Sequence, residues 1–293
     1  MAAEKLGYIG LGTMGMPMAL NFLKAGYDLT VWGRTPSKLQ PAVDAGATLV
    51  TSPKEVADAA DIVFTCVYDT DAVEEVVFAE NGIVAGGTAD KILVDMSTIH
   101  PLKTREFAGR LANACGMKWI DAPVSGGGKG AQEGTLVIMA GGDEPDIKRV
   151  ETVVPAVSRR LTHMGPVGAG QATKLINQII IAAEVAVIAE GFNFAQNFGV
   201  SASKLPDCLA GGWADSSVLQ DHGRRMAAAK YAVGGPINML KDINIATDMG
   251  KNTGSPMPIT SLVAELYRLV AHQGHADKGQ IALMALYSDE PLD

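Results

Sequence analysis

The chain of 293 residues has little cysteine, no basic stripe and no long apolar run. Its three cysteines are spaced too widely for a metal knuckle and too few for a disulfide framework, and the histidines lack metal-ligand spacing. We therefore predict no metal site and buried thiols in a reducing compartment. The net charge of −8 argues against nucleic acid and anionic membrane surfaces. Every apolar stretch of 18 residues is interrupted by charged or polar residues, and there is no secretory signal pattern, so we expect a cytoplasmic protein without a membrane span.

The first half of the chain alternates between two kinds of segment. Short apolar runs alternate with helix-like segments, a pattern typical of a parallel sheet with helices on both faces. The expected strands are 6–9, 28–32, 62–67, 92–95, 118–122 and 136–140. The expected helices are 16–24, 37–45, 53–59, 72–78 and 101–114.

The second half changes character near His163. From Gly168 to about Phe198 the chain has no proline and, past its first turn, a single glycine. A helix of this length spans about 45 Å, too long for one compact layer, so we expect it to link two domains. Further helices are expected at 204–209, 218–229, 239–251, 259–272 and 280–287. We predict an α/β fold, with a Rossmann domain over residues 1–165 and an all-helical domain over residues 166–293.

The loop after the first strand carries a G-x-G-x-x-G pattern. Gly10 suits the tight turn, Gly12 the close approach of a pyrophosphate, and Gly15 the close packing of helix on sheet. The following helix start offers backbone N–H groups to phosphate. We predict that Gly10-Leu11-Gly12-Thr13-Met14-Gly15 binds a dinucleotide.

The end of the second strand bears on the choice between NADP and NAD. The acidic residue that usually binds the ribose 2′-hydroxyl of NAD is missing after Trp32, and Arg34 stands where it meets a 2′-phosphate. Thr35, Ser37 and Lys38 are further donors in this turn. NADP is therefore favoured, with NAD as the alternative if Arg34 is only an exposed loop cation.

Two further segments carry candidate chemistry. Ser125-Gly126-Gly127 follows a predicted strand, where a hydroxyl and unobstructed N–H groups suit a carboxylate. Lys174, Asn177 and Gln178 share one face of the long helix, by their spacing of three and four residues. A lysine at the start of an apolar helix either extends to solvent or serves as a tuned acid in a cleft.

These motifs, in this order, resemble the β-hydroxyacid dehydrogenase family, which includes 3-hydroxyisobutyrate dehydrogenases, tartronate semialdehyde reductases and glyoxylate/succinic semialdehyde reductases. The resemblance also covers Asp95-Met96-Ser97-Thr98, Gly168-Ala169-Gly170-Gln171 and Leu240-Lys241-Asp242. It implies that Lys174 is the general acid and that Ser125, Gly126 and Gly127 bind the substrate carboxylate. It further implies that Asn177 and Gln178 place the reacting group, although relatives often have Asn where Gln178 stands. The implied cofactor contacts are Val67, Tyr68, Thr98 and Lys241, with Asp242 orienting Lys241.

The expected activity is the reversible, NADPH-dependent reduction of a small oxo acid such as tartronate semialdehyde, glyoxylate or succinic semialdehyde. The alternatives are an NAD-linked 3-hydroxyisobutyrate-type dehydrogenase, an imine reductase, and a catalytically silent NADP-binding sensor. Retention of Lys174 and Ser125 disfavours the last two. The helical half also predicts a homodimer or homotetramer.

Overall fold

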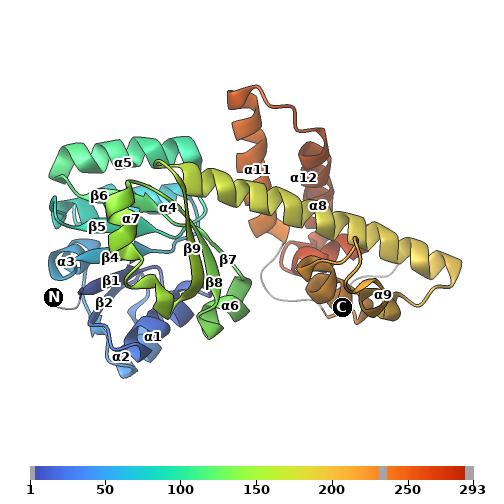
Figure 1. Ribbon diagram of the computed structural model, residues 1–293, viewed down its shortest axis with the longest axis horizontal. Coiled ribbons are helices and arrows are strands. Elements are labelled where there is room, and N and C mark those ends of the chain that lie inside the picture. Colours follow the sequence, from blue (N-terminus) through green and yellow to red (C-terminus); the bar gives the residue numbers. More distant parts are fainter. Residues whose placement is uncertain (1–3, 231–235, 288–293) are drawn as a thin grey trace. The chain divides into compact units, whose positions relative to one another are not determined.

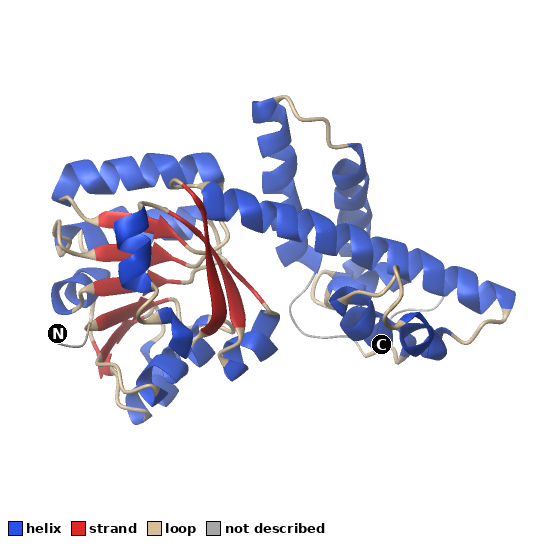
Figure 2. Ribbon diagram, in the orientation of Figure 1, coloured by secondary structure: helices blue, strands red, loops and turns tan. Residues whose placement is uncertain are grey.

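The computed structural model describes residues 4–230 and 236–287. The chain divides into two compact units, Met1–Lys174 (the N-terminal unit) and Leu175–Asp293 (the C-terminal unit). The N-terminal unit is a sheet with helices on its faces, and the described residues of the C-terminal unit are helices and loops (Figures 1 and 2). The predicted α/β class is therefore confirmed.

The sheet of the N-terminal unit has the order β3-β2-β1-β4-β5-β6-β8-β7, with β9 also paired to β8. The strands from β3 to β6 are parallel, as predicted, but β8 runs antiparallel to β6 and β7, so the predicted all-parallel sheet is wrong at this end. Three strands were not predicted, because β3 and β7 have two residues each and β9 is largely polar and exposed. The strands are β1 (Leu6–Ile9), β2 (Leu29–Trp32), β3 (Thr48–Leu49), β4 (Ile62–Thr65), β5 (Ile92–Asp95), β6 (Lys118–Asp121), β7 (Val124–Ser125), β8 (Leu136–Gly141) and β9 (Ser158–Gly165).

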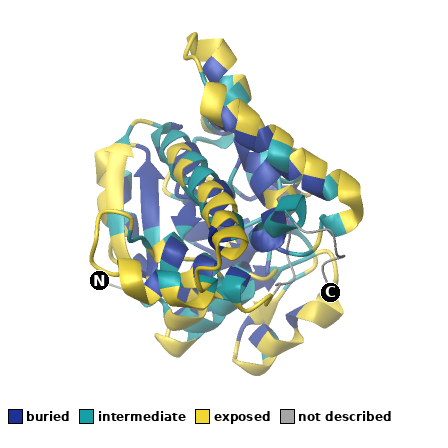
Figure 3. Cartoon of the chain, turned by 90° about the vertical axis from the view of Figure 1, so that its right-hand side faces the viewer, coloured by how far each residue is buried: buried dark blue, intermediate teal, exposed yellow. Residues whose placement is uncertain are grey.

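Helices cover both faces of this sheet, which is why its central strands are buried (Figure 3). Along β4, Ile62 and Phe64 pack into the core of one face and Val63 into the core of the other, as the alternation of strand side chains requires. The first face packs against α1, α2, α6 and α7, and the second against α3, α4 and α5. These helices are α1 (Gly15–Lys24), α2 (Gln40–Asp44), α3 (Pro53–Ala59), α4 (Thr70–Phe78), α5 (Pro101–Cys115), α6 (Gly127–Glu133) and α7 (Glu144–Val150).

The carboxyl ends of the central strands align in one row. Ile9 at the end of β1 pairs with Thr65 of β4, and the same row continues through Asp95 of β5 to Asp121 of β6 and Gly141 of β8. The strand order reverses at β1, which leads to β2 on one side and β4 on the other. Ligands of open α/β sheets bind at such a switch point, outside the carboxyl ends of the strands.

Helix α8 (Ala169–Phe198) is the long helix that the sequence predicted. Its residues from Leu175 onward belong to the C-terminal unit, where Val185, Ala189 and Phe192 pack in a core with residues of α11 and α12. The predicted helix at 218–229 is observed over residues 217–227, with a wider helical turn, Leu219–Gly223, before its last α-helical turn, and residues 280–287 form a 3₁₀-helix. The remaining α-helices of the described residues are α9 (Leu205–Leu209), α10 (Arg224–Ala227), α11 (Pro236–Thr253) and α12 (Pro258–Val270).

By length and composition, α8 is apolar enough to cross a membrane, and it is the one such helix within the described residues. It has a mean hydropathy of 1.7 over its most apolar window, of which 39% is buried. The core contacts of Val185, Ala189 and Phe192 account for part of this apolar character, and the core helix of a globular domain passes the same test.

Candidate active site

The glycine-rich loop joins β1 to α1, and its shape requires glycine at two positions. Gly10 has a φ of 94°, and a Cβ there would lie 2.2 Å from the Cys66 carbonyl oxygen. A Cβ at Gly15 would lie 2.0 Å from the Gly10 carbonyl oxygen, so any side chain would push the helix off the loop. Gly12 faces open space on its Cβ side and is exposed. This is a cradle of bare backbone before a helix start, and it fits the pyrophosphate of a dinucleotide.

The turn after β2 holds the candidate 2′-phosphate residues. Arg34, Thr35 and Lys38 are all exposed here. The turn begins at Trp32, whose indole Nε1 donates to the Thr51 carbonyl oxygen at 3.0 Å. The exposed cations therefore extend from a fixed strand end, and their charge is available to an anion.

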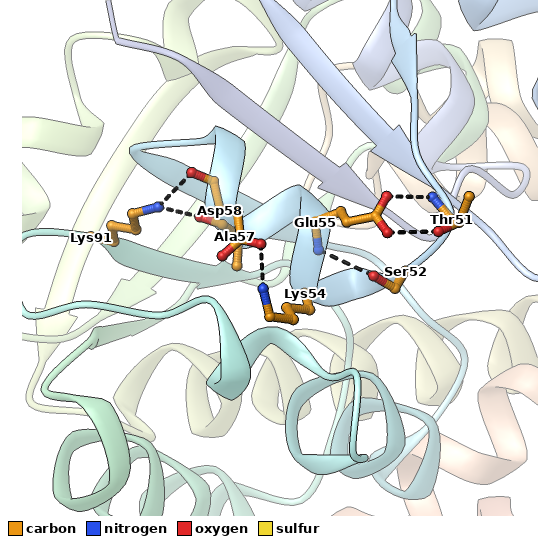
Figure 4. Close-up of polar contacts among 7 residues, drawn as sticks. All are labelled: Thr51, Ser52, Lys54, Glu55, Ala57, Asp58 and Lys91. Carbon is orange, nitrogen blue, oxygen red and sulfur yellow. Dashed lines mark hydrogen bonds and ion pairs between the residues drawn. The ribbon is translucent and has the colours of Figure 1, made fainter.

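Helix α3 begins at Pro53, after the N-cap residue Ser52, and is capped at both ends (Figure 4). Ser52 Oγ accepts from Glu55 N at 3.2 Å, and the Glu55 carboxylate accepts from Thr51 N at 3.0 Å and Thr51 Oγ1 at 2.6 Å. At the other end, Lys91 Nζ donates to the Ala57 and Asp58 carbonyl oxygens. These bonds satisfy helix-end groups and fix the Thr51 backbone, which in turn holds Trp32.

The loops after β4 and β5 carry Val67, Tyr68 and Thr98. Val67 N donates to Ser97 Oγ at 2.9 Å, so the two loops are tied together next to Thr98. Val67 and Thr98 are half-buried, whereas 53% of Tyr68 is exposed. An exposed aromatic ring beside a half-buried apolar residue suits the adenosine side of a dinucleotide, which is the predicted role of this pair.

Two fully buried carboxyl groups, to which the sequence analysis gave no role, end β5 and β6. Asp95 Oδ1 accepts from Thr65 Oγ1 and from Ser97 N, both at 3.0 Å. Asp95 Oδ2 is buried with no hydrogen-bond partner among the described residues. Burial raises the pKa of Asp95 to about 6 and that of Asp121 to about 6. The sequence signal that could have identified these residues is an aspartate at the last position of two consecutive strands.

The segment after β6 presents its backbone. Ser125, the last residue of β7, is half-buried, and Gly126 and Gly127 are exposed, with φ of 130° and 61°. These angles are in the range that favours glycine, and they let α6 start at Gly127 without a side chain over its first amides. The exposed backbone here suits a carboxylate, as predicted.

Lys174 lies in the second turn of α8 and is buried. A lysine is almost never buried unless its amine meets a polar group. Three residues earlier, Gln171 is fully buried, and its backbone N donates to Asp121 Oδ2 at 2.8 Å. The amine is thus carried by a helix start that is bonded to the carboxyl edge of the sheet.

The C-terminal unit places four further candidates in one chain of contacts. Asn177 Nδ2 donates to Gln178 Oε1 at 2.9 Å, and Gln178 Nε2 donates to Asp242 Oδ2 at 2.6 Å. Asp242 also forms an ion pair with Lys241, whose Nζ lies 2.9 Å from Asp242 Oδ1. Gln178 and Asp242 are buried, whereas Asn177 and Lys241 are half-buried. The carboxylate fixes both the amide of Gln178 and the amine of Lys241.

Within the described residues, no group of three or more His, Cys, Asp or Glu side chains is arranged to hold a metal ion. All three cysteines are free, and Cys66 and Cys115 are half-buried whereas Cys208 is exposed.

Two family models together match most of the chain. The NAD binding domain of 6-phosphogluconate dehydrogenase matches residues 5–165. The NAD-binding domain of NADP-dependent 3-hydroxyisobutyrate dehydrogenase matches residues 168–287.

Individual proteins are similar over nearly the whole length. The chain is 39% identical over 285 residues to 2-hydroxy-3-oxopropionate reductase of Escherichia coli (strain K12), covering 96% of each chain. It is 30% identical to glyoxylate/succinic semialdehyde reductase 2, chloroplastic, of Arabidopsis thaliana, covering 93% of this chain and 76% of the relative. The solved structure of Mycobacterium tuberculosis 3-hydroxyisobutyrate dehydrogenase with L-serine has a TM-score of 0.88 and 30% identity, covering 97% of this chain and 98% of that one.

Proposed function

Because the chain belongs to the β-hydroxyacid dehydrogenase family of NAD(P)-dependent oxidoreductases, we propose that it reduces a small oxo acid with NADPH. The substrate class is an aldehyde or ketone bearing a carboxylate, of the tartronate semialdehyde, glyoxylate or succinic semialdehyde type. The observation that carries this proposal is a buried lysine, Lys174, in the same compact unit as a dinucleotide cradle and the exposed backbone of Gly126 and Gly127.

The reaction needs a hydride, a proton and a held substrate. NADPH supplies the hydride to the carbonyl carbon when it is bound. Lys174 donates the proton to the carbonyl oxygen, and in the reverse direction it accepts the hydroxyl proton. A positioned proton donor contributes roughly 10²–10⁴-fold in rate. Ser125 and the N–H groups of Gly126 and Gly127 hold the substrate carboxylate, which fixes the orientation of the carbonyl.

The cofactor is held mainly by backbone. The loop Gly10–Gly15 takes the pyrophosphate, with Leu11, Thr13 and Met14 lining it, and Val67 and Tyr68 flank the adenosine. Thr98 contacts the nicotinamide ribose. Preference for NADPH follows from Arg34 and Thr35, because an exposed guanidinium on a turn without an acidic residue binds a 2′-phosphate.

The C-terminal unit contributes binding groups held by Asp242. Asn177 and Gln178 place the reacting group of the substrate, and Lys241 contacts the cofactor. The ion pair of Lys241 with Asp242 and the bond from Gln178 to the same carboxylate support this assignment, because both groups are held in one orientation. We propose residues 1–165 as the cofactor domain and 166–293 as the substrate and oligomerisation domain.

A second copy of the chain is the proposed partner of α8. Five exposed apolar residues recur at intervals of four or seven along this helix, so they form one stripe. Copies pairing through the same stripe would form a closed, symmetric homodimer or, with a further interface, a homotetramer. A Val187→Glu variant is expected to lower the mass seen by light scattering, whereas an unchanged mass would exclude this surface. The stripe consists of Ile176, Ile180, Val187, Phe194 and Phe198.

Steady-state kinetics test the proposed function. NADPH oxidation is measured with about ten short oxo acids, and the whole series is repeated with NADH and with imine substrates. The proposal expects kcat/KM to be highest for a carboxylate-bearing aldehyde with NADPH. A preference for NADH and 3-hydroxyisobutyrate-type substrates would favour the NAD-linked dehydrogenase, and turnover of imines alone would favour an imine reductase. Tight NADPH binding without turnover of any substrate would indicate a sensor.

Localisation to the cytoplasm is part of the same proposal. It is supported by three free cysteines, which suit a reducing compartment.

A further inference from the structure

We propose that Asp121 and Gln171 are positioning residues, which lock the first turn of α8, and with it Lys174, against the loop that carries Thr98. This inference rests on the proposed function, because it gives Lys174 and Thr98 their roles. Neither Asp121 nor Gln171 has a proposed contact with the substrate or cofactor. They act through the residues next to them.

Asp121 caps the start of α8 with both carboxylate oxygens. Oδ1 accepts from Gly168 N at 2.7 Å, and Oδ2 accepts from Gln171 N at 2.8 Å. The first amides of a helix have no partner within the helix, and an anion at this end also interacts favourably with the helix dipole. Asp121 is the last residue of β6 and is fully buried, so the helix start is fixed to the edge of the sheet.

Gln171 joins the same turn to the backbone on both sides of Thr98. Its Oε1 accepts from Ile99 N at 3.1 Å, and its Nε2 donates to the Ser97 carbonyl oxygen at 2.8 Å. A single carboxamide thus pairs with the residue before and the residue after Thr98, as a neighbouring strand would. Because Gln171 is fully buried, both bonds are shielded from water and their loss is not compensated by solvent.

Two glycines allow the helix to come this close. A Cβ at Gly170 would lie 2.4 Å from the Met139 carbonyl oxygen and 2.6 Å from that of Asp121. A Cβ at Gly141 would lie 2.6 Å from Asp121 Oδ1 and 2.8 Å from Gly170 N. The backbone of α8 therefore rests directly on the strand ends, in a contact that tolerates no side chain.

The geometry connects this anchor to the proposed acid. Lys174 follows Gln171 by three residues, so the two lie on neighbouring turns of one helix face. Ser97, whose carbonyl oxygen receives the Gln171 amide, also accepts the Val67 N–H through its hydroxyl. Displacement of the first turn of α8 would move Lys174 and release the Thr98 loop together. A displacement of about 1 Å in a reacting geometry costs on the order of 10²-fold in rate.

The test compares Gln171→Met with Ser158→Ala. Methionine keeps the length of the side chain but loses both hydrogen bonds. Ser158 is a matched control, because its buried hydroxyl donates to the Val154 carbonyl oxygen at 2.9 Å at the start of β9, away from the carboxyl edge of the sheet. For each variant, four quantities are measured: the thermal midpoint, the NADPH Kd, kcat with its primary deuterium isotope effect, and amide hydrogen exchange of residues 168–174 in the cofactor-free protein.

For Gln171→Met we expect kcat to fall roughly 10–100-fold with less than a threefold change in NADPH Kd. Exchange of residues 168–174 should accelerate. Ser158→Ala should lower the thermal midpoint and leave kcat within twofold. If Gln171→Met instead lowers only the thermal midpoint and keeps kcat and local exchange at wild-type values, the role is purely structural and the inference is overturned. Failure of the wild-type protein to turn over any oxo acid would count against the proposed function, whereas the exchange result would still decide the anchor.

Gln171→Glu keeps the test decisive if the methionine variant does not fold. A protonated glutamic acid has the same acceptor and donor as the carboxamide, whereas the ionised form places negative charge against the Ser97 carbonyl oxygen. The carboxyl groups of Asp121 and Asp95 oppose this ionisation, and the Lys174 amine favours it. We expect kcat relative to wild type to be near one at pH 5.5 and to fall at least tenfold by pH 8. A ratio independent of pH would contradict the inference.

Discussion

Two ends of the same sheet edge differ in how their charges are held. After β2, the cation of Arg34 is exposed on a turn. At the ends of β5 and β6, Asp95 and Asp121 are fully buried and bonded to backbone N–H groups. Charges on the turn are replaceable with little effect on stability, because surface substitutions rarely change folding by more than about 0.5 kcal/mol. The buried carboxylates belong to the core itself. Mutations on the turn should therefore change cofactor preference alone, whereas mutations at the buried carboxylates should change both the stability of the fold and the position of Lys174.

The largest effect on stability is expected from a methyl group added where α8 meets the ends of β6 and β8. Gly170→Ala places a Cβ against two carbonyl oxygens, and overpacking of this kind costs about 1–3 kcal/mol or more. Gly109→Ala is the matched control, because Gly109 lies in the exposed middle of α5 with open space around its Cβ position. Alanine there should stabilise the helix by about 1 kcal/mol. Thermal midpoints of the two variants should move in opposite directions, and equal shifts would show that the contact at Gly170 is not tight.

On the exposed turn after β2, a substitution is expected to change only the preference between NADPH and NADH. Arg34→Ala removes a charge-assisted contact worth about 1.5–3 kcal/mol, so the KM for NADPH should rise roughly 10–100-fold. The KM for NADH and the thermal midpoint should stay near wild-type values. Lys38→Ala is the matched control and should have a smaller effect on NADPH. An unchanged KM for NADPH in Arg34→Ala would show that Arg34 is an exposed loop cation that does not bind the cofactor.

The smallest effect concerns the unpartnered oxygen of Asp95. Its pKa of about 6 in the folded state lies above the usual value of about 3.9 for an unfolded chain. The folded state therefore binds more protons between these values, and stability falls as the pH rises from about 4 to about 6. Asp95→Asn removes the buried charge but keeps an acceptor for Ser97 N and Thr65 Oγ1.

We expect Asp95→Asn to be more stable than wild type by about 1 kcal/mol at pH 7.5, with the difference shrinking towards pH 4. Thermal denaturation across this pH range measures it. A difference that grows on acidification would show that the ionised carboxylate, not the neutral acid, is favoured by the fold.

The sequence predicted local elements well where one signal dominated. The bounds of β1, β5 and α3 agree residue for residue, because apolar runs or a serine cap followed by proline mark them. Helices α6 and α7 were not predicted. Glycines fill the first turn of α6, and its position depends on the neighbouring strands. The antiparallel pairing of β8 could likewise not be predicted from the sequence, because the direction of a strand is set by the path of the chain and not by its composition.

In the candidate site, too, features set by neighbouring residues could be predicted, whereas contacts between residues far apart in the sequence could not. Spacing alone places Lys174, Asn177 and Gln178 on one helix face. The partners of this helix are far away in sequence: the bond from Gln171 Nε2 to the Ser97 carbonyl oxygen spans 74 residues, and that from Gln178 to Asp242 spans 64. Such pairs exist only after the sheet and the helices have packed. Sequence analysis therefore indicated the chemistry of the site but not the groups that hold it in place.

The most direct measurement is the turnover of Lys174→Met with NADPH and the best oxo acid of the panel. Methionine keeps the length and burial of the side chain but removes the amine. If Lys174 is the proton donor, kcat should fall roughly 10²–10⁴-fold while the NADPH Kd stays within threefold of wild type. A kcat within twofold of wild type would contradict the account, because the proton would then come from another group.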